Sequence, residues 1–85
     1  MASTIEQMAD ATVTEFLRQV TREWRTMVRD PLFAHYGGVD SPERQRAYVA
    51  RRVEGYRRAL TEWLHRPEYL ALAEALDAVS LEALE

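Results

Sequence analysis

The chain has 85 residues, enough for one domain, and a chain this short buries only about 60–65% of the surface that it exposes when unfolded. It has no cysteine, which excludes disulfides, thiolate nucleophiles and cysteine-based metal sites, and it has no apolar run near the roughly 18 residues that a membrane span needs. The formal net charge of −3 argues against a generic nucleic-acid binder.

The N-terminal sequence MASTIEQMAD has an acid in place of a basic flank and lacks an apolar stretch, so we do not expect a secretory signal there. Together with the missing cysteines, this favours a cytoplasmic protein that neither enters nor crosses a membrane. Every basic residue is an arginine. A GC-rich bacterial genome accounts for that bias; the alternative is selection for planar guanidinium groups that bind carboxylate or phosphate.

The first expected element is a long helix over residues 4–29. Ser3 or Thr4 can cap it, and Glu6 follows Ser3 at the spacing of a capping box. Apolar side chains then recur every three or four residues and form one broad stripe. The stripe consists of Ile5, Met8, Ala9, Val13, Phe16, Leu17, Val20, Trp24, Met27 and Val28. No helix breaker occurs before the Asp-Pro pair that follows, so the helix is ~37 Å long.

A short turn or helix is expected over residues 31–36. Asp30 can cap it, Pro31 suits its first position, and Gly37 suits the left-handed position that ends a helix. Each unusual residue of the segment therefore has a structural explanation, and we interpret the segment as a connection between helices. The side chains expected to close one end of the core are Leu32, Phe33 and Tyr36.

The second long helix is expected over residues 42–65. Asp40 or Ser41 can cap it, and Pro42 suits its first position. Gly55 lies near its outer face, where glycine costs about 1 kcal/mol relative to alanine, and no feature of the sequence explains it. The apolar face consists of Val49, Val53, Tyr56, Leu60, Trp63 and Leu64.

A third helix is expected over residues 67–79, with a last turn that can reach residue 85. Short links between apolar-faced helices favour antiparallel neighbours. We therefore predict an all-α single domain over residues 1–85, in which two long antiparallel helices and a shorter C-terminal helix form a helical hairpin or three-helix bundle. Three helices cover only part of the first apolar stripe, so we expect a homo-oligomer, most simply a symmetric homodimer. The alternative is a compact monomer whose third helix lies across the groove.

Four arginines form a ridge of one sign opposite the apolar stripe of the first helix. Arg18, Arg22, Arg25 and Arg29 follow one another at intervals of three and four residues, and only Glu15 lies near their row. The ridge is either a solvated face whose cations suit the C-terminal end of the helix dipole or a surface for an anionic partner.

The second long helix carries arginine at every seventh position, also away from its apolar face. These residues are Arg44, Arg51 and Arg58. Glu54 and Glu62 lie four residues before and after the last of them, so we expect a lattice of surface ion pairs that contributes little stability.

Glu62 and His65 have the Glu-x-x-His spacing that places two ligands on one helical face in di-iron bundles. Such a site needs two of these motifs, and the chain has one. We interpret the pair as exposed side chains and expect no cofactor. The remaining alternative is a di-metal site shared across a helical dimer.

The segment Gly38-Val39-Asp40-Ser41 resembles the Gly-x-Asp-Ser motif of acyl carrier proteins, in which the serine carries phosphopantetheine. The resemblance covers about ten residues. Pro42 follows the serine where that family has an apolar residue, and the next helix is rich in arginine where carrier proteins are acidic. We favour helix capping as the role of the serine.

Catalysis is not expected, because the chain has no cysteine, two histidines and no glycine-rich phosphate loop. We predict a small non-enzymatic accessory or adaptor protein that binds another protein, or itself, through an apolar helical seam flanked by arginine. Aromatic side chains and arginine are both enriched at protein interfaces. The expected anchors are Phe16, Trp24 and Trp63, beside the four-arginine ridge. The alternative is a nucleic-acid-associated factor that uses the ridge on phosphates.

Overall fold

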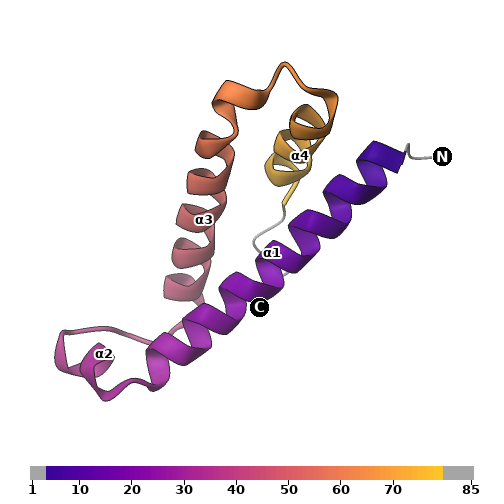
Figure 1. Cartoon of the computed structure of the whole chain (residues 1–85). Helices are drawn as coiled ribbons and strands as arrows, with labels where there is room; N and C mark the ends of the chain where they lie inside the picture. Colours follow the sequence, from indigo (N-terminus) through magenta and orange to yellow (C-terminus); the bar gives the residue numbers. More distant parts are fainter. Residues whose placement is uncertain (1–3, 80–85) are drawn as a thin grey trace.

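The computed structural model describes residues 4–79, and all regular secondary structure among them is helical (Figure 1). The all-α prediction is therefore confirmed. The elements are α1 (Thr4–Arg29), α2 (Pro31–His35), α3 (Pro42–Ala59), a 3-10 turn η1 (Thr61–Trp63) and α4 (Pro67–Asp77).

Helix α1 spans the same residues as the first expected helix. Its buried positions follow the predicted stripe and are Ala9, Val13, Val20 and Trp24. Glu6 lies in the first turn and Arg29 in the last, which is the charge order that the helix dipole favours. The expected cap at Ser3 lies outside the described residues.

The α1–α2 connection is built as the local signals predict. The carboxylate of Asp30 accepts a hydrogen bond from the backbone N–H of Leu32 at 2.9 Å. Gly37 has a φ of +84°, the left-handed conformation in which glycine is favoured. The expectation for the end of the core was wrong in part. Phe33 is half-buried, but Leu32 and Tyr36 are exposed, because the five-residue α2 presents only one face to α1.

Helix α3 begins as predicted and ends early. The Ser41 hydroxyl accepts a hydrogen bond from the N–H of Arg44 at 3.2 Å, and Pro42 occupies the first helical position. The α-helix stops at Ala59 instead of reaching residue 65, and η1 continues the chain as a corner. The side chain of Leu60, buried at this corner, belongs to the core, and the corner turns the chain back so that α4 can pack on α1.

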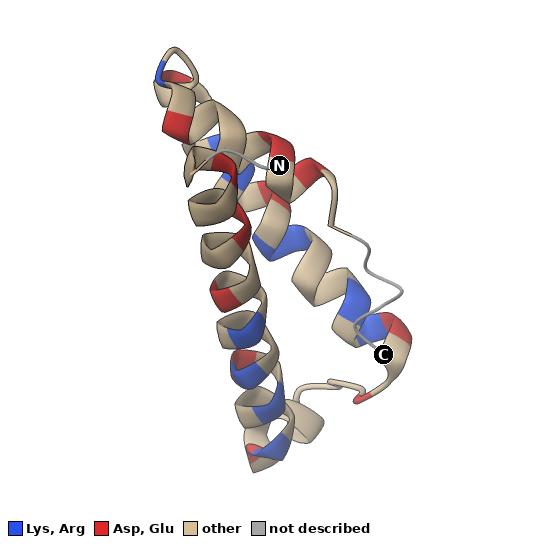
Figure 2. Cartoon of the chain, turned by 90° about the vertical axis from the view of Figure 1, so that its right-hand side faces the viewer, with Lys and Arg blue, Asp and Glu red and all other residues tan. Residues whose placement is uncertain are grey.

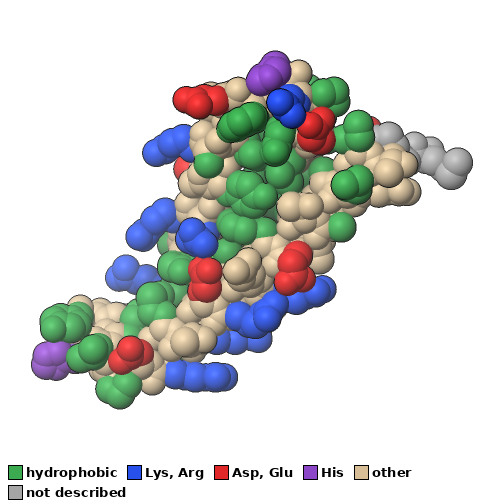
Figure 3. Space-filling model, in the orientation of Figure 1, with side chains coloured by type: hydrophobic (Ala, Val, Ile, Leu, Met, Phe, Trp, Pro, Cys, Tyr) green, Lys and Arg blue, Asp and Glu red, His purple; other side chains and the backbone are tan. Residues whose placement is uncertain are grey.

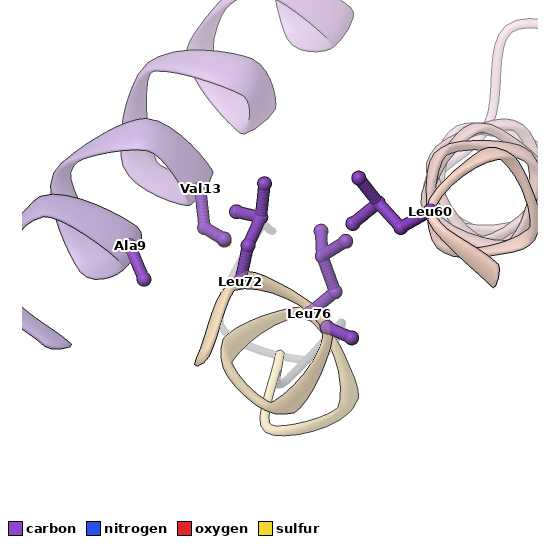
Figure 4. Close-up of a cluster of buried hydrophobic side chains, with 6 residues drawn as sticks. Ala9, Val13, Leu60, Leu72 and Leu76 are labelled. Carbon is purple, nitrogen blue, oxygen red and sulfur yellow. The ribbon is translucent and has the colours of Figure 1, made fainter. Parts of the chain in front are cut away.

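Helix α4 packs chiefly on α1 and only lightly on α3. It begins at Pro67 and ends at Asp77, two residues before the expected end at 79; the expected last turn to residue 85 lies outside the described residues. Its inner side chains meet those of α1 and the end of α3 in the main core (Figure 4). This core cluster consists of Ala9, Val13, Leu60, Leu72, Ala73 and Leu76.

The two long helices run in opposite directions but diverge, so that they form the arms of a V with its vertex beside α2 (Figure 1). Helix α4 fills the open end of the V. A second small group of buried residues, Val20, Trp24 and Val49, lies outside the main core cluster. The chain is elongated as a result, with extents of 46 × 27 × 17 Å.

Candidate interaction surfaces

The three aromatic residues predicted as anchors lie in three different environments. Trp24 is 5% exposed, and its ring centroid lies 5.8 Å from that of Phe33 and 5.6 Å from that of Tyr48. Its indole is therefore part of the chain's own core and not an open anchor in this conformation. Phe16 is half-buried and meets Tyr56 edge to face, with ring centroids 4.7 Å apart.

Only Trp63 among the three has a large open surface, at 46% exposed. It lies in the corner η1, where its ring is 5.8 Å from that of Tyr69. The guanidinium carbon of Arg66 lies 5.7 Å from the centroid of the Trp63 ring, within the range of a cation–π contact. The early end of α3 thus converts a predicted core-facing position into an exposed aromatic corner.

The N-terminal end of the apolar stripe also remains open. Met8 is 65% exposed and Ile5 is 39% exposed. Both border a hollow of about 290 Å³, which Tyr69 and Leu72 of α4 line from the other side. The stripe of α1 is therefore covered by α4 along its middle and left accessible at its beginning.

The four-arginine ridge lies on the exposed side of α1, where the helical projection places it. The structure pairs two of its members with one acid: Arg18 lies 3.1 Å and Arg22 3.3 Å from the carboxylate of Glu15. Arg25 and Arg29 form no ion pair within residues 4–79. The charged residues in the N-terminal half of α1 are all acids, whereas its C-terminal half carries the four arginines and one acid, Glu23 (Figure 2), so the net charge of the helix is opposite at its two ends.

The expected ion-pair lattice on α3 is present at only one of its predicted positions. Arg58 lies 3.1 Å from the carboxylate of Glu54. Glu62, the other predicted partner, falls in η1 and forms no ion pair with Arg58. Arg44 and Arg51 form no ion pair among the residues that the structure describes.

A polar contact that the spacing of residues does not predict joins α1 to α3. The hydroxyl of Tyr48 donates a hydrogen bond to Oε2 of Glu23 at 3.1 Å, and Nε of Arg52 lies 3.3 Å from the same oxygen. Burial raises the pKa of Tyr48, and the hydrogen bond to Glu23 raises it further. The guanidinium of Arg52 also lies 5.9 Å from the ring centroid of Phe16. An acid next to a buried tryptophan was the available signal, but periodicity alone does not identify its partner.

The weak metal candidates do not share the helical face that their spacing required. Glu62 lies in η1 and His65 in the turn that follows, because the α-helix has already ended at Ala59. Within residues 4–79 no group of three potential metal-ligating side chains comes together. Ser41 acts as the cap of α3, the role that we favoured over carriage of a prosthetic group.

None of the described helices combines the length and apolarity that crossing a bilayer requires. Comparison of the chain with protein-family models, with curated proteins and with solved structures gave no match.

Proposed function

We propose that the chain is a small non-enzymatic accessory or adaptor protein that binds another protein, or a second copy of itself, through its apolar seam. The observation that carries this proposal is the face seen in Figure 3, where hydrophobic side chains gather in a band between the arms of the V. Arginines stand along the outer edge of α3 and beside the C-terminal half of α1, with acids among them. An apolar centre with a charged rim is the usual anatomy of a protein interface.

The thinness of the core supports association. The radius of gyration is 14.8 Å, whereas a compact domain of this length has one of roughly 12 Å. Many hydrophobic side chains around the core are only partly buried, and an additional chain would remove them from water. They include Phe16, Leu17, Val53, Tyr56, Leu64, Tyr69, Ala71, Ala75 and Val79. A symmetric homodimer is the commonest way in which small chains complete such a core.

In this proposal the three-helix unit of α1, α3 and α4 associates as one piece in the cytoplasm. Its exposed anchors are Met8 at the open end of the V and Trp63 at the corner. Arg25 and Arg29, on the opposite side of α1, supply cations that have no ion partner among residues 4–79. Trp24, which is buried, packs beneath the surface and does not open onto it. Phe16 contributes the part of its ring that remains accessible.

The alternative is a nucleic-acid-associated factor. Arg25 and Arg29 favour it, because neither has an ion partner in the described part of the chain and guanidinium groups bind phosphate well. The acidic half of α1 opposes it by repelling a phosphate backbone. The dependence of binding affinity on salt concentration distinguishes the two functions. Affinity that depends on phosphate contacts falls steeply as ionic strength rises, whereas the affinity of an apolar interface does not.

Size-exclusion chromatography with light scattering and native mass spectrometry tests the proposal. We expect the wild-type chain to form a dimer or a stable complex that persists in high salt. Met8→Asp places a charge in the open apolar surface and should release the monomer with helicity unchanged by circular dichroism. Gln7→Asp adds the same charge at the adjacent exposed position, outside the hollow, and should leave the assembly intact.

Two results would contradict the proposal. One is a wild-type chain that remains monomeric and retains no protein in a tagged pull-down. The other is a complex whose only component besides the chain is nucleic acid and whose affinity falls steeply with salt, which would favour the alternative.

A further inference from the structure

A second hollow, of about 250 Å³, lies at the vertex of the V and shares no lining residue with the hollow beside Met8. We call it the vertex pocket. Its inner wall is formed by the aromatic rings of Trp24, Phe33 and Tyr48, and Arg44 and Arg51 stand at its rim. Its volume is slightly below that of typical small-molecule sites and suits one large apolar side chain.

The inner wall of the vertex pocket is fixed by packing. The Trp24 ring is in contact with both other aromatic rings, and it is 5% exposed. The Phe33 ring is held from the other side by the backbone of Gly38, because a Cβ there would lie 2.6 Å from it. A hollow walled by rings that pack on one another is already shaped before a ligand arrives, which lowers the entropic cost of binding.

The rim of the vertex pocket follows one face of α3. Arg44, Ala47, Tyr48 and Arg51 are spaced at i, i+3, i+4 and i+7, and the two arginines are therefore roughly 10 Å apart along the helix axis. Both arginines are exposed and have no ion partner among residues 4–79. The small side chain of Ala47 between them leaves room for another backbone to approach.

We infer that the vertex pocket binds an acidic helix of a partner protein. Two carboxylates seven residues apart would pair with Arg44 and Arg51, and an apolar side chain between them would enter the hollow. The inference rests on the proposed function, a protein-binding module, and names the chemistry of one partner. Guanidinium and carboxylate form two parallel hydrogen bonds, and a helical spacing of seven on one chain matches the same spacing on the other.

The partner is a different protein and not a second copy of this chain. Among residues 4–79 the only two acids seven positions apart are Glu23 and Asp30. Glu23 is already bonded to Tyr48 across the two arms, and Asp30 caps α2. Duplex nucleic acid is also a poor occupant, because its outward-facing phosphates offer no apolar group for the aromatic wall.

A synthetic peptide provides the probe. It is an end-capped helix, held by a side-chain staple, with two Glu seven residues apart and Leu between them. It is titrated into the full ¹⁵N-labelled chain, and NMR shifts are followed at the amides of Gly37 and Gly38 and at the indole N–H of Trp24, because these three residues line the vertex pocket. We expect saturable binding of one peptide per chain at these signals. Peptides with Gln for Glu, or Ser for Leu, should bind more weakly.

Variants of the chain show which side chains contribute to the affinity for the peptide. Arg44→Ala and Arg51→Ala should each weaken peptide binding about tenfold, since each removes a charge-assisted contact. Arg58→Ala removes the same charge from the next heptad position of α3, outside the vertex pocket, and should change the affinity less than about twofold. Ala47→Phe keeps both arginines, fills the hollow and should abolish binding.

Three outcomes would overturn the inference: no saturable peptide binding, equal weakening by Arg58→Ala, or a single-stranded oligonucleotide that shifts the same signals while the peptide does not. Light scattering on the same samples separates this inference from the proposed function. If assembly persists and peptide binding is absent, only the vertex pocket fails. If the peptide binds but the chain never assembles, the proposal of assembly through the seam is contradicted and the inference about the vertex pocket is supported.

Discussion

The ring of Phe33 lies against the backbone of Gly38 so closely that a Cβ at Gly38 would stand 2.6 Å from three of its carbon atoms. The same ring packs edge to face on Trp24, with centroids 5.8 Å apart. The backbone of Gly38 and the indole therefore hold Phe33 between them. The contact fixes how α2 folds back at the vertex.

Gly38→Ala should lower the free energy of unfolding by about 1–3 kcal/mol, because the added methyl group forces the Phe33 ring out of its packed position. Urea unfolding followed by circular dichroism measures the change. The Phe33→Leu background provides the control, since a smaller side chain should relieve most of the added penalty. Equal losses in both backgrounds would contradict the steric explanation.

Gly55→Ala should have the opposite effect. Apart from the adjacent backbone of α3 itself, no atom lies within 4 Å of a Cβ built at Gly55, and the residue is exposed inside the last turns of α3. Alanine therefore gains helix propensity without a clash and should raise the free energy of unfolding by about 0.5–1 kcal/mol. The same urea experiment tests this. A destabilised variant would show that the glycine serves a purpose that the single chain does not reveal, such as close approach of another chain.

The two tryptophans should respond differently to truncation. Trp24→Ala removes a buried ring that contacts two others, and it should destabilise the fold by about 3–5 kcal/mol. Trp63→Ala removes a half-exposed ring and should cost the isolated chain no more than about 1 kcal/mol, while weakening any assembly that uses the corner. Thermal unfolding and light scattering report the two effects separately. Similar stability losses would contradict the burial difference.

The Tyr48–Glu23 contact predicts a dependence of stability on alkaline pH. The pKa of Tyr48 is raised above 10.0 because burial, and then the hydrogen bond to Glu23, disfavour the phenolate. A raised pKa in the folded state means that the stabilisation is complete below about pH 10 and is lost as pH rises through the raised value. Urea unfolding at a series of alkaline pH values measures this fall in the free energy of unfolding. Tyr48→Phe should remove this alkaline loss, whereas Tyr36→Phe, at an 80% exposed position, should retain it.

The sequence predicted the helices well where local signals decide the structure. Asp30 and Ser41 cap the helices that follow them, and a proline opens each of those helices. The end of α3 was wrong because Leu60, Trp63 and Leu64 fit the spacing of a continuing helix as well as that of a 3-10 corner. The choice between the two depends on α4, which needs the chain to turn back before Pro67.

The interaction surfaces were harder to predict because burial depends on tertiary packing. Trp24 and Trp63 carry the same signal in the sequence, an aromatic residue on an apolar face, yet α2 and α3 cover only the first. The exposure of the arginine ridge followed from periodicity alone. The vertex pocket could not be predicted from periodicity, because Trp24, Gly38 and Arg44 come to line one hollow only after α2 has folded back.

The pairing of the first described helix with the last has a consequence for synthesis of the protein. Ala9 and Val13 of α1 have their core partners Leu72 and Leu76 about sixty positions later in the chain. A ribosome must therefore deliver nearly every described residue before the main core can form, and until then the apolar stripe of α1 lacks its principal cover. A nascent chain halted within α3 should consequently remain bound to a hydrophobic-sensing chaperone and should be digested readily by added protease, whereas one released past residue 79 should resist.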